Sequence, residues 1–325
     1  MTTPGGSPST ARDTQPYPRD IVGYGPTTPD PQWPGGAVIA VQFVLNYEEG
    51  AENNPLHGDP GSETFLSELA DPAAFPNRHM SMESNYEYGS RAGLWRVLRA
   101  FEKRDLPLTI FGVAKALERN PEALAAFQRL GHEIACHGLW WKSYQLVDEE
   151  TERRDMAEAV KLMIELTGEH PLGWYTGRDS PNTRRLVVEQ GGFLYDSDSY
   201  GDDLPYWAQV DTEDGATHSQ LVVPYSLETN DMKFSSPSGF STGKDFEDHL
   251  RDAFDVLYAE GLAGSPKMLN VGLHCRIVGR PARTAALERF LDYVQSRDRV
   301  WVARRADIAR HWIDHHPAPS PPLDG

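Results

Sequence analysis

The chain has 325 residues, with 31 Lys and Arg against 48 Asp and Glu, so its formal net charge is −17. This charge argues against nucleic acid or an anionic membrane as the main partner. No run reaches the roughly 18 consecutive apolar residues that a membrane-spanning helix needs, and the N-terminus lacks the apolar core of a secretory signal. Two cysteines are too few for a disulfide framework. We therefore expect a cytoplasmic protein without a membrane partner.

Flexible tails are expected at residues 1–16 and 317–325, which are rich in Pro, Gly, Ser and Thr, around one domain at 17–316. In chain order, apolar runs predict strands at 37–45, 107–113, 132–137, 171–174, 221–225, 268–274 and 300–302. Helical spacing of apolar residues predicts helices at 121–130, 156–167, 181–190, 246–257 and 287–294. A further helix is predicted after Ser90, which can cap its N-terminus.

These repeated units predict an α/β protein with a mainly parallel sheet. About seven units in roughly 280 residues suit a closed or nearly closed β/α barrel, with an open doubly wound sheet as the alternative. The first strand is not followed by a Gly-rich phosphate loop, so dinucleotide binding is not expected. Residues 46–89 show no sustained periodicity, and a long irregular segment after the first strand indicates a functional role.

Polar and aromatic residues follow four predicted strands at the point where each strand ends. They occupy positions 46–49, 137–141, 175–178 and 274–276. Because β/α barrels place their active sites at the carboxyl ends of the strands, we expect these groups to converge on one mouth.

Adjacent carboxylates and a distant histidine can carry out hydrolysis. Glu48 or Glu49 can take a proton from water, and His274 can protonate a leaving group. The alternative is a solvated pair of glutamates, but their place after a fully apolar strand favours a role in the site. His137 and His274, each next to a cysteine, lack the spacing of a CxxC or HxxxH zinc motif, so zinc is not expected from them.

Other side chains near the expected mouth have open roles. Trp140 and Trp141 can line a ligand pocket or pack in the core. Arg178 can orient a carboxylate or carbonyl of a substrate, whereas Arg184 is expected on a helix surface.

The order of these motifs resembles the polysaccharide deacetylase (NodB-homology) superfamily over residues 17–312, which implies a distorted seven-stranded β/α barrel. Where that family has Thr-Phe-Asp-Asp-Gly, this chain reads Asn46-Tyr47-Glu48-Glu49-Gly50. The resemblance implies that Glu48 is the base and that Glu49 replaces a metal-binding aspartate. The family's Leu-His motif matches Leu273-His274, whose histidine serves as the acid.

Two departures from the family pattern bear on metal binding. The His-(Ser/Thr)-x-x-His motif keeps His137 but has Trp141 in place of the second histidine. The arginine of the Arg-x-Pro motif is absent from 175–177, and Arg178 is the candidate to replace it. Catalytic zinc usually has three protein ligands, and tryptophan cannot supply one. We therefore expect no metal and no other cofactor.

Longer stretches resemble the allantoinase branch of this superfamily: FVLNYEEG from Phe43, RHMSMESNYEYGSRAGLWR from Arg78, GWYTGR from Gly173, YDSDSYGDDLPYW from Tyr195 and GLHCRIVGRPAR from Gly272. The resemblance implies hydrolytic opening of the hydantoin ring of allantoin to allantoate in purine breakdown. It also implies cofactor-independent catalysis and a homotetramer.

Under this interpretation, Glu48 activates water, with Glu49 as the second candidate, and His274 protonates the departing ring nitrogen. Residues 46–89 are expected to cover the site. The predicted substrate-binding residues are Asn46, Glu49, His79, Glu83, His137, Trp141, Tyr175 and Arg178.

Three alternatives share parts of this evidence. Another cyclic amide or imide hydrolase would have the same metal-free site and a different substrate preference. A metal-dependent amino-sugar deacetylase would lose activity on chelation. A non-catalytic binding module would show no turnover that depends on Glu48 or His274.

Overall fold

The computed structural model describes residues 17–69 and 72–319, so the predicted tail at 1–16 and most of that at 317–325 lie outside the described residues. The strands are β1 (Ile39–Tyr47), β2 (Thr109–Gly112), β3 (Glu133–Cys136), β4 (Gly173–Trp174), β5 (Tyr195–Asp196), β6 (Tyr206–Asp211), β7 (Thr217–Val222), β8 (Lys267–His274) and β9 (Val300–Val302). The helices are α1 (Met80–Tyr88), α2 (Leu94–Glu102), α3 (Ala114–Arg119), α4 (Pro121–Arg129), α5 (Glu149–Thr167), α6 (Thr183–Gln190), α7 (Gly243–Leu262), α8 (Pro281–Gln295) and α9 (Arg305–His315).

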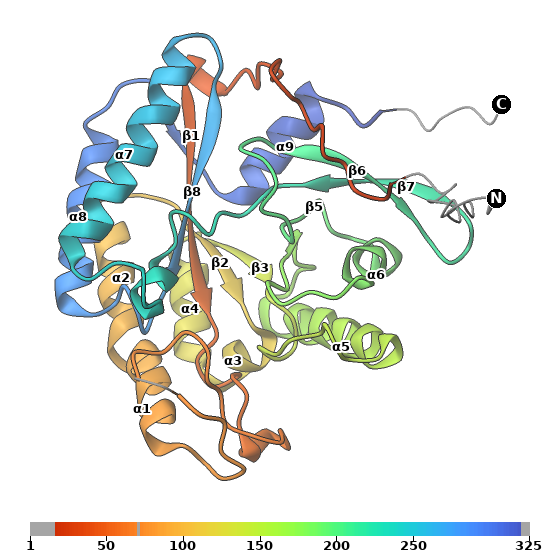
Figure 1. Cartoon of the computed structure of the whole chain (residues 1–325), viewed down its shortest axis with the longest axis vertical. Helices are drawn as coiled ribbons and strands as arrows, with labels where there is room; N and C mark the ends of the chain where they lie inside the picture. Colours follow the sequence, from red (N-terminus) through yellow and green to blue (C-terminus); the bar gives the residue numbers. More distant parts are fainter. Residues whose placement is uncertain (1–16, 70–71, 320–325) are drawn as a thin grey trace, which may run out of the picture.

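One sheet of nine strands forms the centre of the molecule (Figure 1). Eight of the strands follow the order β6-β7-β5-β4-β3-β2-β1-β8, and β9 lies off this path and pairs with β1. The seven strands from β7 to β8 along this path are parallel, whereas β6 runs antiparallel to β7. β9 pairs with the first half of β1, and β2 pairs with its second half. The predicted single-domain, distorted seven-stranded β/α barrel is therefore confirmed, with β6 and β9 as additional strands.

The barrel is only partly closed. Within residues 17–69 and 72–319, no strand pairing joins β7 to β8, and the chain after β7 reaches β8 through a bridge between Asn230 and Gly272. Helices α2, α7 and α8 lie on one side of β1 and β8, and α5 and α6 lie beside β3 to β5 (Figure 1). This arrangement leaves the carboxyl ends of the central strands as one shared edge.

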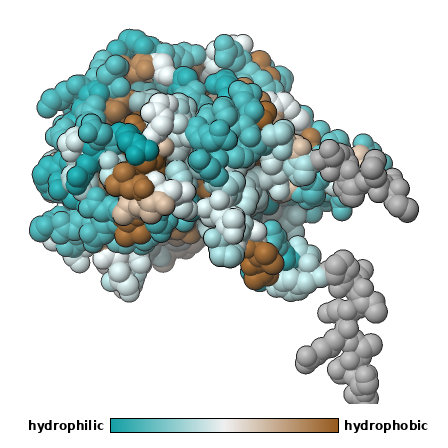
Figure 2. All heavy atoms as spheres, turned by 90° about the horizontal axis from the view of Figure 1, so that it is seen from above, coloured by the Kyte–Doolittle hydropathy of each residue, from teal (hydrophilic) through white to brown (hydrophobic). Residues whose placement is uncertain are grey.

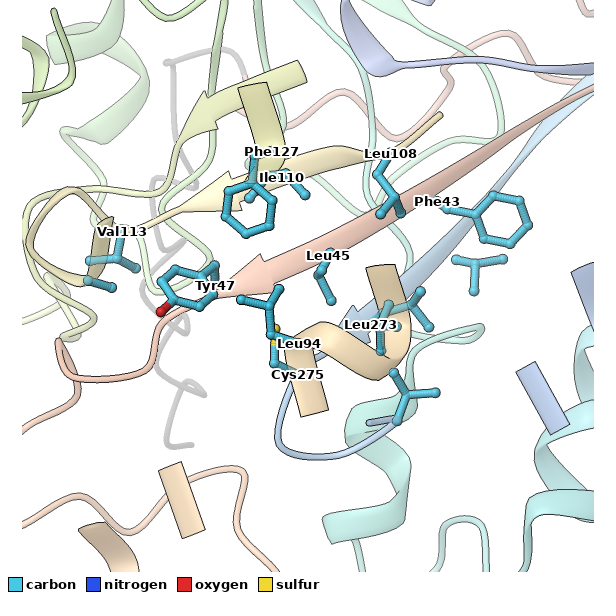
Figure 3. Close-up of a cluster of buried hydrophobic side chains, with 14 of the residues drawn as sticks. Phe43, Leu45, Tyr47, Leu94, Leu108, Ile110, Val113, Phe127, Leu273 and Cys275 are labelled. Atoms are coloured by element: carbon cyan, nitrogen blue, oxygen red, sulfur yellow. The ribbon is translucent and has the colours of Figure 1, made fainter. Parts of the chain in front are cut away.

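Alternation along β1 separates the outer core from the barrel interior. Phe43, Leu45 and Tyr47 belong to the core that packs under the helices, where Figure 3 shows them among residues from neighbouring elements. Val44 points the other way and packs with Phe111 and other side chains of the interior. Because successive side chains of a strand point to opposite faces, Asn46, two residues after Val44, points into the barrel as well.

The structure corrects two local predictions and extends others. No new helix begins at Ser90, because α1 and α2 are joined by a π-helical turn at Gly89–Gly93, so the end of the segment 46–89 is helical. Arg184 is not a free surface residue: its guanidinium donates to Asp196 Oδ2 at 2.7 Å and to the backbone oxygen of Asp198. The sequence analysis also did not predict β5, β6, α1, α3 or α9.

Polar residues predominate on the face of the molecule drawn in Figure 2. Figure 2 shows a mostly hydrophilic face on which apolar residues form small, separate groups. None of the helices in the described residues is long and apolar enough to span a membrane. The apolar residues identified in the sequence are thus used mainly in the core, as the outer and inner layers of the sheet require.

Replacement of Gly93 by alanine is expected to destabilise the fold. A Cβ at Gly93 would overlap the backbone oxygen of Cys275, which cannot move without shifting the end of β8. Overpacking of this kind costs about 1–3 kcal/mol, so the thermal unfolding midpoint should fall by several degrees. The control is Gly201→Ala, where an added Cβ meets nothing closer than a Ser199 side-chain oxygen at 3.4 Å. Equal midpoints for the two variants would contradict this close contact.

Candidate active site

A cavity of about 140 Å³ lies at the carboxyl ends of β1, β3, β4 and β8. Residues from all four sequence groups that follow these strands line the cavity. The segment 46–89 and the chain after β7 contribute further lining residues. The structure thereby brings together seven of the sequence-predicted site residues, namely Asn46, Glu48, His137, Trp141, Tyr175, Arg178 and His274.

Strand alternation explains why these side chains face the cavity. Asn46 and Glu48 lie two and four positions after Val44, which points into the barrel. His137 lies two positions after Ala135, another interior residue. Glu49, the next residue, does not line this cavity.

Glu48 is the central acidic group of the cavity, with only 1% of its side chain exposed. Its Oε1 lies 3.4 Å from His137 Nε2 and 3.5 Å from His274 Nε2, and its Oε2 lies 2.8 Å from the guanidinium of Arg276. Burial alone would raise the pKa of Glu48, but the positive charges of Arg276 and His274 hold it well below its usual range. Glu48 is therefore a carboxylate at neutral pH.

His274 is held between two carboxylates. Its Nδ1 lies 2.6 Å from Asp231 Oδ1, and its backbone N–H donates to Asp231 Oδ2 at 2.8 Å. Burial by itself would lower the pKa of His274, but the negative charges of Asp231 and Glu48 outweigh it and raise the pKa to about 9. The imidazole is thus protonated at neutral pH, with Nε2–H directed towards Glu48 and the cavity.

His137 has one nitrogen occupied by the backbone. Its Nδ1 donates to the carbonyl oxygen of Tyr175 at 2.8 Å, and its ring stacks on that of Tyr175 with centroids 5.1 Å apart. The other ring nitrogen, Nε2, faces Glu48 Oε1 at 3.4 Å. The backbone bond fixes the ring orientation, so His137 presents the same nitrogen to any ligand.

Arg276 is the positive group that the sequence prediction did not assign. It is fully buried between Glu48 and Glu49, whose oxygens lie 2.8 and 3.6 Å from its guanidinium nitrogens. Its Nε donates to the backbone oxygen of Leu66, and its guanidinium lies over the rings of Tyr86 and Trp141. Arg276 lies two residues after His274, just past the end of a predicted strand, and this position was the available signal for it.

Arg178, the predicted substitute for the missing family arginine, contacts a different carboxylate. Its guanidinium lies 3.3 Å from Glu63 Oε2 and 4.2 Å from the ring centroid of Trp141. It lines the cavity without contacting Glu48. Arg276, rather than Arg178, therefore neutralises the predicted base.

The residues present do not fit the divalent metal that the polysaccharide deacetylase pattern implies. Trp141 stands where that pattern has its second histidine, and the two carboxylates of that pattern already flank the guanidinium of Arg276. No group of three His, Cys, Asp or Glu side chains suited to a metal occurs in the described part of the chain. A fixed guanidinium thus supplies the positive charge beside both glutamates.

Three predicted substrate-binding residues do not line this cavity. Glu49 and Glu83 line a second, polar cavity of about 420 Å³ on the other side of Arg276. Burial and the charge of Glu48 raise the pKa of Glu49 despite the opposing effect of Arg276. His79 caps α1, with its Nδ1 accepting from the backbone N–H of Met82.

The segment after β7 supplies residues that the sequence analysis missed. Asp231 orients His274, while Tyr225 and Asn230 line the cavity. Phe65 and Leu66 complete the lining from within the segment 46–89. Asp231 precedes His274 by 43 residues and lies in no motif, so the sequence carried no signal for their pairing.

Comparisons with known proteins agree with this architecture. A model of the polysaccharide deacetylase family matches residues 77–193. A Schizosaccharomyces pombe protein, named as an unproven polysaccharide deacetylase, is 43% identical in an alignment of 315 residues that covers 92% of this chain and 98% of that protein. The chain therefore belongs to the polysaccharide deacetylase family.

Two crystal structures match nearly the whole chain. A Pseudomonas aeruginosa protein, also named only as a candidate polysaccharide deacetylase, has a TM-score of 0.90 and 59% identity over 93% of this chain and 100% of its own. The allantoinase PuuE has a TM-score of 0.91 and 58% identity over 94% of this chain and 100% of its own. The fold of the chain is thus that of both proteins.

Replacement of Asp231 by asparagine is expected to lower the pKa of His274 from about 9, because one of the two negative charges that raise it is removed. The imidazole then loses its proton at a lower pH than in the unmodified protein. NMR titration of the His274 ring measures this shift, with Asp248→Asn on the exposed face of α7 as the control. An unchanged titration in the Asp231 variant would contradict the assigned electrostatic pairing.

Proposed function

We propose that the protein hydrolyses the ring amide of a small cyclic substrate, and that this substrate is allantoin. The single observation that carries the proposal is the juxtaposition of the Glu48 carboxylate and the protonated His274 in one small cavity. A base and an acid placed on the same cavity suit the two proton transfers of amide hydrolysis.

Glu48 can hold and activate the attacking water. Its Oε1, which lies 3.4 Å from His137 Nε2, accepts one proton of the water. A lone pair of the water oxygen then remains free to attack the ring carbonyl. As the new C–O bond forms, the water proton passes to Glu48, and the carbonyl oxygen takes up negative charge.

His274 completes the reaction as the acid. Its Nε2 proton passes to the ring nitrogen as the C–N bond breaks, which gives a ring-opened carboxylic acid and an N–H group. Glu48 Oε1 lies 3.5 Å from His274 Nε2, so the proton held by Glu48 can return to His274 and restore the starting state. Asp231 keeps the ring in position throughout.

The cavity dimensions support a small substrate over a sugar chain. Pockets for drug-sized ligands measure about 300–1,000 Å³, whereas this cavity is about 140 Å³. Phe65, Leu66 and Trp141 form apolar walls, and Asn46 and Arg178 supply polar contacts for carbonyl and N–H groups. Allantoin combines a small ring with several such groups, and the 58% identity to an allantoinase favours it among cyclic amides.

The proposal includes catalysis without a metal or other cofactor, as the guanidinium of Arg276 beside both glutamates supports. It also includes a homotetramer in the cytoplasm, which rests on the family resemblance and on the composition of the sequence.

The purified protein is expected to hydrolyse racemic allantoin and to keep this activity after exhaustive chelation. The measurement is allantoate release, with metal content determined on the same samples. Activity that is lost on chelation and restored by zinc would overturn the metal-free site and favour an amino-sugar deacetylase. Absence of turnover in both conditions would reject allantoin and direct the assay to cyclic imides and other hydantoins.

Replacement of Glu48 by glutamine is expected to lower kcat by about 100- to 10,000-fold, because the amide keeps the shape of the side chain but cannot take a proton. His274→Ala should cause a comparable loss through removal of the acid. The matched control is Glu83→Gln, because Glu83 is also a buried glutamate but lines the other cavity. Turnover by the Glu48 variant at the rate of the control would reject Glu48 as the base.

A further inference from the structure

The hydroxyl of Tyr225 occupies an unusual position in the hydrogen-bonding network of the cavity. Two side-chain amides point at its oxygen, with Asn46 Nδ2 at 2.9 Å and Asn230 Nδ2 at 3.2 Å. All three side chains line the cavity with Glu48 and His274. Tyr225 itself is 4% exposed, so bulk water does not compete freely for these bonds.

The orientation of both amides is fixed by backbone partners. Asn46 Nδ2 also lies 3.0 Å from the carbonyl oxygen of Leu273, which can only accept. Asn230 Oδ1 accepts from the backbone N–H of Met232 at 2.9 Å, which leaves its Nδ2 facing Tyr225. Since an amide nitrogen only donates, the Tyr225 oxygen must accept both hydrogen bonds.

These two bonds leave the phenolic proton of Tyr225 without an acceptor. A hydroxyl offers one donor and two acceptor positions, and the asparagines take both acceptor positions. Among the described residues, no side chain or backbone group accepts a hydrogen bond from the Tyr225 hydroxyl. Burial also raises the pKa of Tyr225, which keeps the hydroxyl protonated at neutral pH. The Tyr225 hydroxyl is thus a buried hydrogen-bond donor that is available to a ligand in the cavity.

Gly272 makes room for this arrangement. A Cβ at this position of β8 would overlap both the Tyr225 hydroxyl and the Asn230 amide. His274 lies two residues further along β8, on the same face of the strand. The Tyr225 hydroxyl therefore lies against β8 two residues before His274, the residue proposed as the acid.

We propose that the Tyr225 hydroxyl donates its hydrogen bond to the carbonyl oxygen of the cyclic amide and stabilises the oxyanion that forms when water attacks. This inference rests on the proposed hydrolysis and adds a catalytic residue to it. No bond to Tyr225 forms or breaks: Glu48 takes the proton of the water, His274 supplies the proton of the leaving nitrogen, and Tyr225 keeps its own. Its hydrogen bond stabilises the negative charge that develops on the carbonyl oxygen, in a site for which no metal ion is proposed.

The test replaces Tyr225 by phenylalanine in the full-length protein. Loss of one oxyanion donor typically lowers kcat by about 100- to 1,000-fold, and we expect this loss with a much smaller change in KM. The matched control is Tyr144→Phe, which removes a buried hydroxyl that donates to Asp155 outside the cavity. Thermal unfolding of both variants measures any structural contribution.

Three outcomes of this comparison would overturn the inference. An unchanged kcat in the Tyr225 variant would show that the hydroxyl does not contact the reacting oxygen. A rise in KM alone, or a kcat loss that matches the Tyr144 control, would assign Tyr225 to substrate binding or to structure.

A second substrate keeps this test separate from the test of allantoin. If the wild-type protein does not hydrolyse allantoin, that proposed function fails, and the same kcat comparison is made with the hydantoin or cyclic imide that the protein does hydrolyse. A kcat loss of about 100- to 1,000-fold in the Tyr225 variant on that substrate would support the hydroxyl as the oxyanion donor. An unchanged kcat there, or no turnover of any cyclic amide by the wild type, would overturn the inference.

Discussion

The buried guanidinium of Arg276 is the interaction on which the rest of the site depends. Two glutamates at the end of an apolar strand would repel each other and lose their hydration, so they need a positive charge between them. Arg276 supplies it from the end of the neighbouring strand, over the rings of Tyr86 and Trp141. Removal of one member of a buried ion pair typically costs about 3–5 kcal/mol, because the partner remains charged and unpaired. The geometry of Glu48 is therefore tied to the packing of the whole cavity wall.

The Arg276 guanidinium also holds part of the segment 46–89 against the site. The backbone oxygen of Leu66 accepts from Arg276 Nε, and Leu66 adopts a positive φ of 48° that is uncommon for a residue with a side chain. Such a conformation persists where surrounding contacts fix it, and here the contact is with the central cation of the site. The same segment supplies Phe65 as an apolar wall. The segment thus forms part of the cavity wall at the mouth of the barrel.

Charge separation within the cavity follows from where each group is held. Glu48 stays anionic beside Arg276, and His274 stays cationic because Asp231 and Glu48 face its two nitrogens. The charges of the proposed acid and base are therefore set by fixed neighbours at the ends of β1 and β8 and on the chain after β7. Tyr225 and its two asparagines add a neutral donor to this arrangement. The proposed hydrolysis needs such a donor, because negative charge develops on the substrate oxygen as water attacks.

The sequence by itself determined the β/α alternation and the functional groups at the carboxyl ends of the parallel strands, although not which of Glu48 and Glu49 faces the cavity. These features are local, because they depend on apolar periodicity. By contrast, only the tertiary structure decided that Arg276 rather than Arg178 neutralises Glu48, that Asp231 orients His274, and that Glu83 faces another cavity. The physical reason is that ion pairs and hydrogen bonds require atoms within a few ångströms, and chain folding sets these distances between residues that no local pattern connects.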